Sequence, residues 1–267
     1  MNILAFDIGG TKIAYGLMNE KGCLLSEITK VKTPDSADKI TDLLKKAVNE
    51  YEFDGLAVCT AGMVNDGKVV SKPLNLPEGY EKIDFKSLKN VPFVIENDAN
   101  AAAWCEYKIG AAKKNNNAII LAIGTGVGCG IICDNKLLKG KNGAAGEVSF
   151  PISGKDFIKI AQKNGVNEQD CFVIKKMAEN NNEKAKNVMK EWYDNLVASL
   201  VVLSNLFDTE TIVMTGSLAK LIDYQKINED IKNKCIGIPP KILSAKFENN
   251  AGLSGIALLC AEKNNNT

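Results

Sequence analysis

Two carboxylates, Glu96 and Asp98, stand where the apolar run VPFVI (91–95) meets the alanine-rich segment that begins at Ala99. An Asp at the start of a helix is typical of an N-cap, which is the simplest interpretation of Asp98. The chain contains no histidine, which excludes a Ser/His/Asp triad, a histidine base and any zinc site that needs imidazole. If the protein moves a proton, a carboxylate is the natural base, and Asp98 is the candidate.

Two similar glycine turns are the second chemical feature. The segment LAFDIGGTKIAYGLMNEKGCLL from Leu4 resembles LAIGTGVGCGIICDNKLL from Leu121. Each predicts an apolar strand, a glycine turn with a threonine, a second apolar strand, a polar turn and a third short apolar run. Glycine turns expose backbone N–H groups that can hold phosphate oxygens, although tight hairpins also use glycine for conformation alone.

Neither turn fits the common nucleotide cradles. From Gly124 the GxGxxG spacing reaches Cys129, and the segment continues into a second strand rather than a helix. The chain also lacks a GxxxxGK[ST] loop. A nucleotide held by these turns must therefore be held in another way.

The remaining elements alternate between strands and helices. Amphipathic spacing predicts helices over 35–53, 97–108 and 184–206, with a further short helix closing the chain after Ala251. The runs DGLAVCTAG (54–62) and TIVMTGSLAKL (211–221) each predict a strand that ends in glycine. This alternation predicts an α/β fold with a mixed sheet in each half. The polar run KKNNNA (113–118) is the expected boundary, giving lobes over 1–113 and 114–251, with the C-terminal helix 252–267 joining the first.

Composition limits the partners and the compartment. A net charge of +1 without a basic block gives no footprint for nucleic acid, and no apolar run reaches membrane-spanning length. We expect small-molecule partners and a cytoplasmic protein without a secretion signal. The eight cysteines are scattered without a CxxC pair, and even the close pair Cys129 and Cys133 indicates core packing rather than a metal site.

Six motifs together resemble a known family. They are DIGGTK (7–12), TAGMV (60–64), ENDANAAA (96–103), GTGVGCG (124–130), GAAGE (143–147) and TGS (215–217). Their types and order resemble the ROK sugar kinases and repressors, within the hexokinase and actin-like ATPase superfamily, from Asp7 to about Gly255. AAAWCEY (101–107) most resembles the N-acetylmannosamine kinases of that family. The resemblance implies a two-lobed, actin-like (ribonuclease H-like) α/β fold with a central cleft.

The resemblance also implies where ATP and magnesium bind. Asp7 would orient Mg²⁺ through water, since Mg²⁺ keeps most of its hydration shell. Lys12 would meet phosphate, although an exposed lysine at a strand edge is an alternative. The full set implied for ATP is Asp7, Gly9, Gly10, Thr11, Lys12, Gly124, Thr125, Gly126, Gly128 and, near the adenosine, Gly216.

The sugar site follows from the same resemblance. Asp98 would accept the proton of the attacking sugar hydroxyl, and Glu147 would bind hydroxyls near the anomeric carbon. Asn75, Asn97 and the Gly62 backbone would contact sugar hydroxyls, with a turn-forming role as the alternative for Asn75. Glu96 is expected to be structural.

The chain departs from the family pattern after Glu147. Ser149 and Phe150 stand where the family has Gly and His, and Cys171 stands alone where the family has a zinc-binding cysteine cluster. We therefore expect no zinc site. The segment from Phe150 to Phe172 is expected to supply a shortened, metal-free replacement for this wall of the sugar pocket.

The sequence thus predicts an ATP-dependent hexose or N-acylhexosamine kinase acting on a 6-hydroxyl, with N-acetylmannosamine ahead of glucose and N-acetylglucosamine. A sugar-responsive repressor of the family would carry a DNA-binding extension, whereas six residues precede Asp7. A non-catalytic sugar sensor is a third alternative. A homodimer, and closure of the lobes on sugar, are further expectations from the resemblance.

Overall fold

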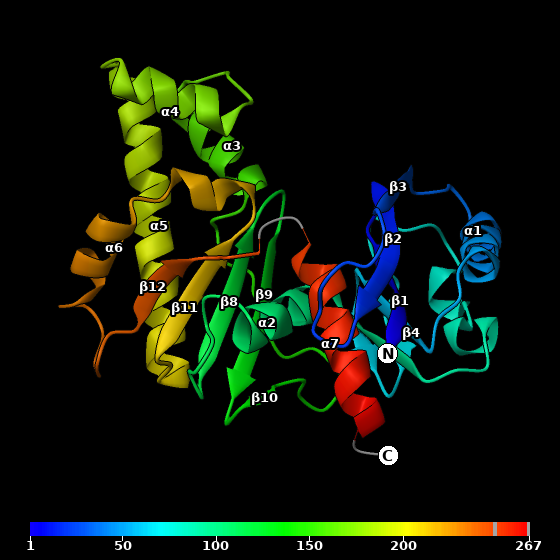
Figure 1. The fold of residues 1–267 in the computed structure, drawn as a ribbon. Coiled ribbons are helices and arrows are strands. Elements are labelled where there is room, and N and C mark those ends of the chain that lie inside the picture. Colours follow the sequence, from blue (N-terminus) through cyan, green and yellow to red (C-terminus); the bar gives the residue numbers. More distant parts are fainter. Residues whose placement is uncertain (248–249, 266–267) are drawn as a thin grey trace.

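The computed structural model describes residues 1–247 and 250–265. It contains two five-stranded sheets with helices between them and around them (Figure 1). Residues 266 and 267 of the expected C-terminal helix lie outside the described residues. Over residues 1–247 and 250–265, no helix is both long enough and apolar enough to cross a membrane.

The first sheet has the strand order β3-β2-β1-β4-β7. β1 lies at its centre, antiparallel to β2 and parallel to β4, and β4 is parallel to β7. These strands are β1 (Asn2–Ile8), β2 (Lys12–Asn19), β3 (Thr29–Lys32), β4 (Gly55–Thr60) and β7 (Phe93–Asn97). A two-stranded hairpin, β5 (Val64–Asn65) and β6 (Lys68–Val69), follows β4.

The second sheet repeats this arrangement, with the order β10-β9-β8-β11-β12. β8 is antiparallel to β9 and parallel to β11. The strands are β8 (Ala118–Ile123), β9 (Val127–Cys133), β10 (Lys136–Leu137), β11 (Thr211–Thr215) and β12 (Lys241–Ser244). The predicted mixed sheet in each half and the repeated glycine hairpin are confirmed.

The third strand of the first hairpin lies later in the chain than the sequence predicts. The expected run CLL (23–25) makes only an isolated bridge, Leu24 to Met18, and the paired strand β3 begins at Thr29. The Ser26 hydroxyl accepts a hydrogen bond from the Leu17 backbone N–H at 2.9 Å. A side chain thus takes the place of a ladder partner here, and this delays the strand.

The first sheet is covered on one face by α1 (Ala37–Glu50) and the short helices η1 (Tyr80–Lys82) and η2 (Phe85–Leu88). The Ser36 hydroxyl caps α1 by accepting from the Lys39 backbone N–H. The spacing predicts an apolar face of Ile40, Leu43, Leu44 and Val48, and all of these are buried except Leu43, which is partly buried. This face forms the first hydrophobic core.

Two helices, α2 (Asp98–Lys108) and α7 (Ala251–Asn265), lie between the sheets (Figure 1). Their backbones approach closely, because a Cβ built on Gly255 would lie 1.7 Å from the Ala101 carbonyl oxygen. α7 packs mainly against the first sheet, and α2 also packs against the second through Trp104 and Ala103. The boundary expected at 113–118 separates the strands of the two sheets, but the lobe boundary itself stays a prediction.

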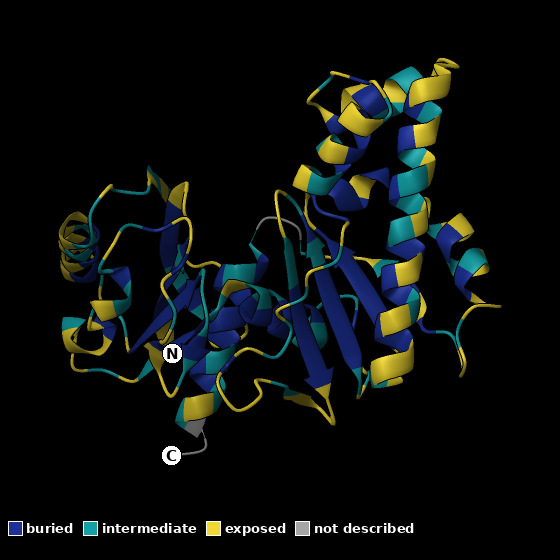
Figure 2. Ribbon diagram, turned by 180° about the vertical axis from the view of Figure 1, so that it is seen from behind, coloured by how far each residue is buried: buried dark blue, intermediate teal, exposed yellow. Residues whose placement is uncertain are grey.

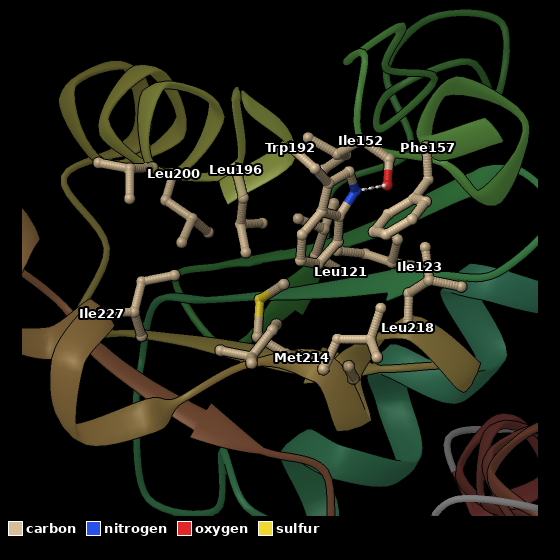
Figure 3. Close-up of a cluster of buried hydrophobic side chains, with 14 of the residues drawn as sticks. Leu121, Ile123, Ile152, Phe157, Trp192, Leu196, Leu200, Met214, Leu218 and Ile227 are labelled. Carbon is tan, nitrogen blue, oxygen red and sulfur yellow. Dashed lines mark hydrogen bonds between the residues drawn. The ribbon is translucent and has the colours of Figure 1, made fainter. Parts of the chain in front are cut away.

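The outer face of the second sheet carries the largest core. It is covered by α3 (Gly154–Lys163), α4 (Cys171–Glu179), α5 (Glu183–Phe207), η3 (Ser217–Leu221) and α6 (Tyr224–Ile231). Trp192 of α5 is fully buried, and its indole Nε1–H donates to the Ile152 carbonyl at 2.8 Å (Figure 3). The buried strands and the exposed outer faces of these helices are visible in Figure 2. The stripe Trp192, Leu196, Leu200 and Leu203 is buried as predicted.

Candidate active site

Asp98 is the first residue of α2, and the N-cap of this helix is Asn97. The Asn97 Oδ1 accepts from the backbone N–H groups of Ala99 at 2.9 Å and Asn100 at 3.1 Å. The interpretation of Asp98 as the cap is therefore wrong. The same Asn97 side chain also contacts the wall of the site, because its Nδ2 donates a hydrogen bond to the Gly62 carbonyl at 3.0 Å.

The Asp98 carboxylate reaches solvent within a cavity, although protein surrounds it on most sides. Its Oδ1 accepts from the Ala99 backbone N–H at 2.8 Å. Desolvation, together with the negative charges of Asp7 and Glu147, raises the pKa of Asp98 to about 6. A carboxylate with such a pKa is ionised at neutral pH and is a stronger base than an ordinary Asp.

Asp7 lies at the end of β1, next to Cys59 on the parallel strand β4. Burial raises the pKa of Asp7, while a hydrogen bond from the Cys59 thiol and the charge of Lys12 oppose this effect. A Cβ on Gly252, at the start of α7, would lie 3.0 Å from Cys59 Sγ and 3.3 Å from Asp7 Oδ2. The Asp7 side chain is thus packed between β4 and α7. The sequence indicated Cys59 only as a core residue, because nothing in a strand pattern reveals which buried side chain lies beside a carboxylate.

One cavity of about 670 Å³ brings together every residue predicted to bind sugar. Its size is within the range of small-molecule sites. Gly126 and Gly128 of the second glycine turn line the same cavity, which places that turn beside Asp98. The predicted sugar residues along its wall are Gly62, Asn75, Asn97, Asp98 and Glu147.

The second glycine turn has open space in front of it. A Cβ built on Gly124 or Gly126 would meet no heavy atom within 4 Å, so the turn leaves room for a ligand group against its backbone. The turn closes by a hydrogen bond from the Gly124 N–H to the Gly126 carbonyl at 2.9 Å. Thr125 at its tip is exposed. This geometry fits a phosphate cradle, in which a side chain would fill the ligand's place.

The first glycine turn lies next to the sugar wall. A Cβ on Gly10 would lie 2.4 Å from Asn75 Cβ and 2.5 Å from the Asn75 carbonyl oxygen, so only glycine fits here. The Thr33 hydroxyl donates to the Gly9 carbonyl at 2.6 Å and ties the turn down. Thr11 and Lys12 are exposed beside it. The second glycine turn therefore lines the cavity itself, whereas the first turn is connected to it through Asn75 of the cavity wall.

Gly216 lies behind the second turn. It has a φ of +88°, and a Cβ there would lie 2.4 Å from the carbonyl oxygen of Ile123, the residue before Gly124. Gly216 also lines a small cavity of about 90 Å³ together with Thr215, Lys220 and Ser244. Since β11 and β12 are parallel, this cavity lies at their carboxyl ends, where α/β folds commonly place ligands.

The residues at hand fit magnesium better than a structural metal. Mg²⁺ is commonly held by one or two carboxylates, waters and substrate phosphates, so Asp7 beside a phosphate cradle is a sufficient protein contribution. Over residues 1–247 and 250–265, no group of three or more His, Cys, Asp or Glu side chains is arranged to hold a metal ion.

The segment after Glu147 does not line this cavity. Among the described residues, the lining ends at Glu147, whereas the segment 150–172 was expected to rebuild the wall. Ile152 and Phe157 are instead buried against Trp192 of α5, and the Gly154 N–H donates to the Gly124 carbonyl at 2.7 Å. The segment therefore supports the second glycine turn from outside the cavity, and the expectation of a replacement wall is wrong for this site.

Glu96 has structural partners, as expected. It is 1% exposed, its Oε2 forms an ion pair with Lys139, and its Oε1 accepts from the Asn97 N–H at 3.0 Å and Asn100 Nδ2 at 3.1 Å. Sequence reasoning missed both Asn100 and Lys139. The partnership with Lys139 crosses between the sheets, and no local pattern signals it.

Comparison with known proteins identifies the family. The profile described as "ROK family" matches residues 3–151 and 148–263. The chain belongs to the ROK family. An N-acetylmannosamine kinase of Yersinia pestis is 27% identical over 282 residues, covering 96% of this chain and 97% of its own. A glucokinase of Streptomyces coelicolor is 42% identical over 151 residues, covering 54% of this chain and 47% of its own.

Solved structures of the family share the fold. A ROK family glucokinase from Streptomyces griseus, in complex with glucose and AMPPNP, aligns with a TM-score of 0.76 at 27% identity, covering 97% of this chain and 99% of its own. The α/β, actin-like ATPase fold expected from the sequence is therefore confirmed. The chain is a sugar kinase of the ROK family, an ATP-dependent enzyme.

Proposed function

We propose that this kinase transfers the γ-phosphoryl group of ATP to the 6-hydroxyl of an N-acylhexosamine, with N-acetylmannosamine as the favoured substrate. The observation that carries the proposal is the cavity that Asp98, with a pKa near 6, shares with Gly126 and Gly128 of the second glycine turn, while the first turn packs against Asn75 of its wall. The near full-length match to N-acetylmannosamine kinases favours that sugar over others.

Asp98 has the properties required of the base. Its ionised carboxylate would accept the hydroxyl proton as the oxygen attacks phosphorus, and it would orient that hydroxyl beforehand. The N-terminal position of Asp98 on α2 fixes its backbone, because Asn97 provides the cap. Alignment supplies much of the rate in phosphoryl transfer, so a rigidly placed base is valuable.

Binding of the sugar falls to the rest of the wall. Glu147 lines the same cavity, and its negative charge raises the pKa of Asp98. It would accept hydrogen bonds from hydroxyls close to the anomeric carbon. Asn75 would provide a side-chain amide, and its backbone packs against Gly10. A shift of the bound sugar that displaces Asn75 would therefore also displace the first glycine turn.

The two glycine turns and Gly216 would hold ATP. Gly124 and Gly126 offer an unobstructed backbone for phosphate, and the adenosine would lie near Gly216. Asp7 would orient the magnesium ion, whose charge neutralises phosphate oxygens when it is bound. A homodimer stays a prediction, which sedimentation of the purified protein would test.

The test is a panel of hexoses and N-acetylhexosamines with Mg-ATP, read as kcat/KM from coupled ADP release. We expect N-acetylmannosamine to give the highest value, and phosphorylation at its 6-position is checked by NMR of the product. A higher kcat/KM for an unacylated hexose would contradict the proposed substrate. Absence of ADP release with every sugar would contradict the kinase reaction.

Glucose phosphorylation is the second candidate. A glucokinase matches about half of the chain at 42% identity, higher than the near full-length match to the N-acetylmannosamine kinases. The apolar side chains of Met63, Pro73 and Leu74 in the cavity wall nevertheless favour a substrate with an acyl group. The same panel separates the two sugars.

A further inference from the structure

The loop over residues 138–147, here named the strap, joins the second sheet to the first. It leaves β10, crosses to the hairpin β5/β6 and ends at Glu147 in the sugar cavity. Asn65 Nδ2 donates to the Lys141 carbonyl at 3.4 Å, and a Cβ on Gly143 would lie 2.2 Å from the Val64 carbonyl oxygen. The strap therefore lies directly on the first lobe's hairpin.

Its strongest anchor is the ion pair between Lys139 and Glu96. Glu96 is 1% exposed and belongs to β7, two residues before Asp98. Its other oxygen accepts from the Asn97 N–H and from Asn100 Nδ2, so the same carboxylate contacts the strap and the start of α2. The Asn97 side chain caps that helix.

Hydrogen bonds within the strap connect Lys139 to Glu147. The Lys139 carbonyl accepts from the Ala145 N–H at 3.1 Å, and the Ala144 carbonyl accepts from the Glu147 N–H at 3.2 Å. A Cβ on Gly146 would lie 2.1 Å from the Cys129 carbonyl oxygen, so the end of the strap rests on β9. The loop is thus folded on itself between two fixed points.

We propose that Lys139 is a positioning residue for the sugar site, which holds Glu147 opposite Asp98 by anchoring the strap to buried Glu96. This inference rests on the proposed sugar kinase function. Lys139 itself does not line the cavity that contains Asp98, as far as the described residues define it. Its effect on a sugar must therefore pass through the strap.

Removal of Lys139 leaves a buried carboxylate without its cation. Such a loss is strongly unfavourable where the remaining charge stays buried, although Lys139 is about half exposed and solvent screens part of the effect. The structure relieves the unpaired charge by letting the strap or the end of β7 move toward water. Either movement displaces Glu147 relative to Asp98 and weakens sugar binding, while the glycine turns remain in place.

The kinetic test compares Lys139→Met with Lys139→Arg, and uses Lys141→Met as the matched control. Lys141 holds Asn65 through its backbone carbonyl, so loss of its side chain leaves that contact intact. We expect Lys139→Met to raise the sugar KM at least tenfold with the ATP KM changed less than twofold. Lys139→Arg and Lys141→Met should stay within twofold of the wild type for both. An unchanged sugar KM, or equal rises for sugar and ATP, would overturn the proposal.

A double variant tests the pairing itself. In a protein that already carries Glu96→Gln, the further change Lys139→Met should raise the sugar KM less than twofold, because the pair is already broken. A full tenfold rise in that background would show that Lys139 acts without Glu96.

Hydrogen exchange provides a readout that does not need turnover. Lys139→Met should speed hydrogen exchange of the Ala145 and Glu147 amides at least tenfold relative to wild type and to Lys141→Met. Unchanged exchange rates would show that Lys139 does not hold the strap in place. Wild-type protein without activity on any sugar, but with exchange that responds as expected, would count against the kinase proposal alone.

Discussion

The pKa of Asp98 makes the acid limb of the pH profile a direct test of the mechanism. The carboxylate must be ionised to accept a proton, and burial beside Asp7 raises its pKa to about 6 from an ordinary 3.8. kcat/KM reports groups of the free enzyme. We therefore expect kcat/KM to rise with pH and to reach a plateau above neutrality, with a midpoint near 6.

The size of the effect follows from that value. With a pKa of about 6, Asp98 is ~9% ionised at pH 5, ~50% at pH 6 and ~91% at pH 7, so kcat/KM should rise about tenfold from pH 5 to pH 7. An Asp with the ordinary pKa would already be ~94% ionised at pH 5, and the rise would be less than 10%.

The assay is coupled ADP release with the best sugar at subsaturating concentration, over pH 5 to 8. Glu147→Gln should lower kcat/KM and also move the midpoint to lower pH, because the Glu147 charge raises the pKa of Asp98. A flat profile between pH 5 and 8, in an enzyme shown to stay folded, would refute Asp98 as a base with a raised pKa.

Replacement of the carboxylate separates chemistry from folding. Asp98→Asn should lower kcat by about 10²- to 10⁴-fold, the usual contribution of a general base. Because the folded protein raises the pKa of Asp98, its ionisation makes folding less favourable as pH rises from about 4 to about 6. Asp98→Asn should therefore have a Tm at pH 7 equal to or above that of the wild type. A lower Tm would point to an unrecognised structural role.

Two glycine substitutions test the cradle and the helix pair. The Cβ of Gly126→Ala meets open space, so this variant should keep the wild-type Tm. Because that Cβ occupies the proposed phosphate position, the ATP KM should rise about tenfold or more in initial-rate assays. An unchanged ATP KM would show that this turn does not bind ATP. Gly255→Ala places a Cβ 1.7 Å from the Ala101 carbonyl oxygen. Overpacking of this kind should lower the free energy of unfolding in urea by about 1–3 kcal/mol. An unchanged free energy of unfolding would show that α2 and α7 can move apart without cost.

Much of the fold could be predicted because its signals are local. The strands β1 and β8 are apolar runs ended by glycine, and the helical stripe from Trp192 to Leu203 has the expected spacing over about three turns. The delayed strand β3 was missed because a single hydroxyl, that of Ser26, decides it. Apolar spacing carries no information on such a hydrogen bond.

The candidate site was predictable in its members, and less so in their arrangement. The residues Asn75, Asn97, Asp98 and Glu147 come from three separate segments and line one cavity. The structural partners that hold them, among them Lys139, belong to other elements and depend on how the lobes pack. A sequence without aligned relatives gives no signal for pairs formed only by tertiary packing.

The junction between β7 and α2 shows how this fold resolves the competition between structure and chemistry. A helix start needs an acceptor for its free N–H groups, and Asp98 could have served, but a carboxylate engaged as a cap would be held by backbone donors that favour its ionised form and lower its pKa. Asn97 takes that role with a neutral amide whose Nδ2 donates to the Gly62 carbonyl, while Glu96 accepts from the Asn97 backbone N–H. Backbone hydrogen bonds from the Ala99 and Asp98 N–H groups lower the pKa of Asp98, but desolvation by burial is the larger effect. The order Glu, Asn, Asp therefore divides anchoring, capping and proton acceptance among three adjacent side chains. Exchange of the last two residues should retain the helix and abolish the base.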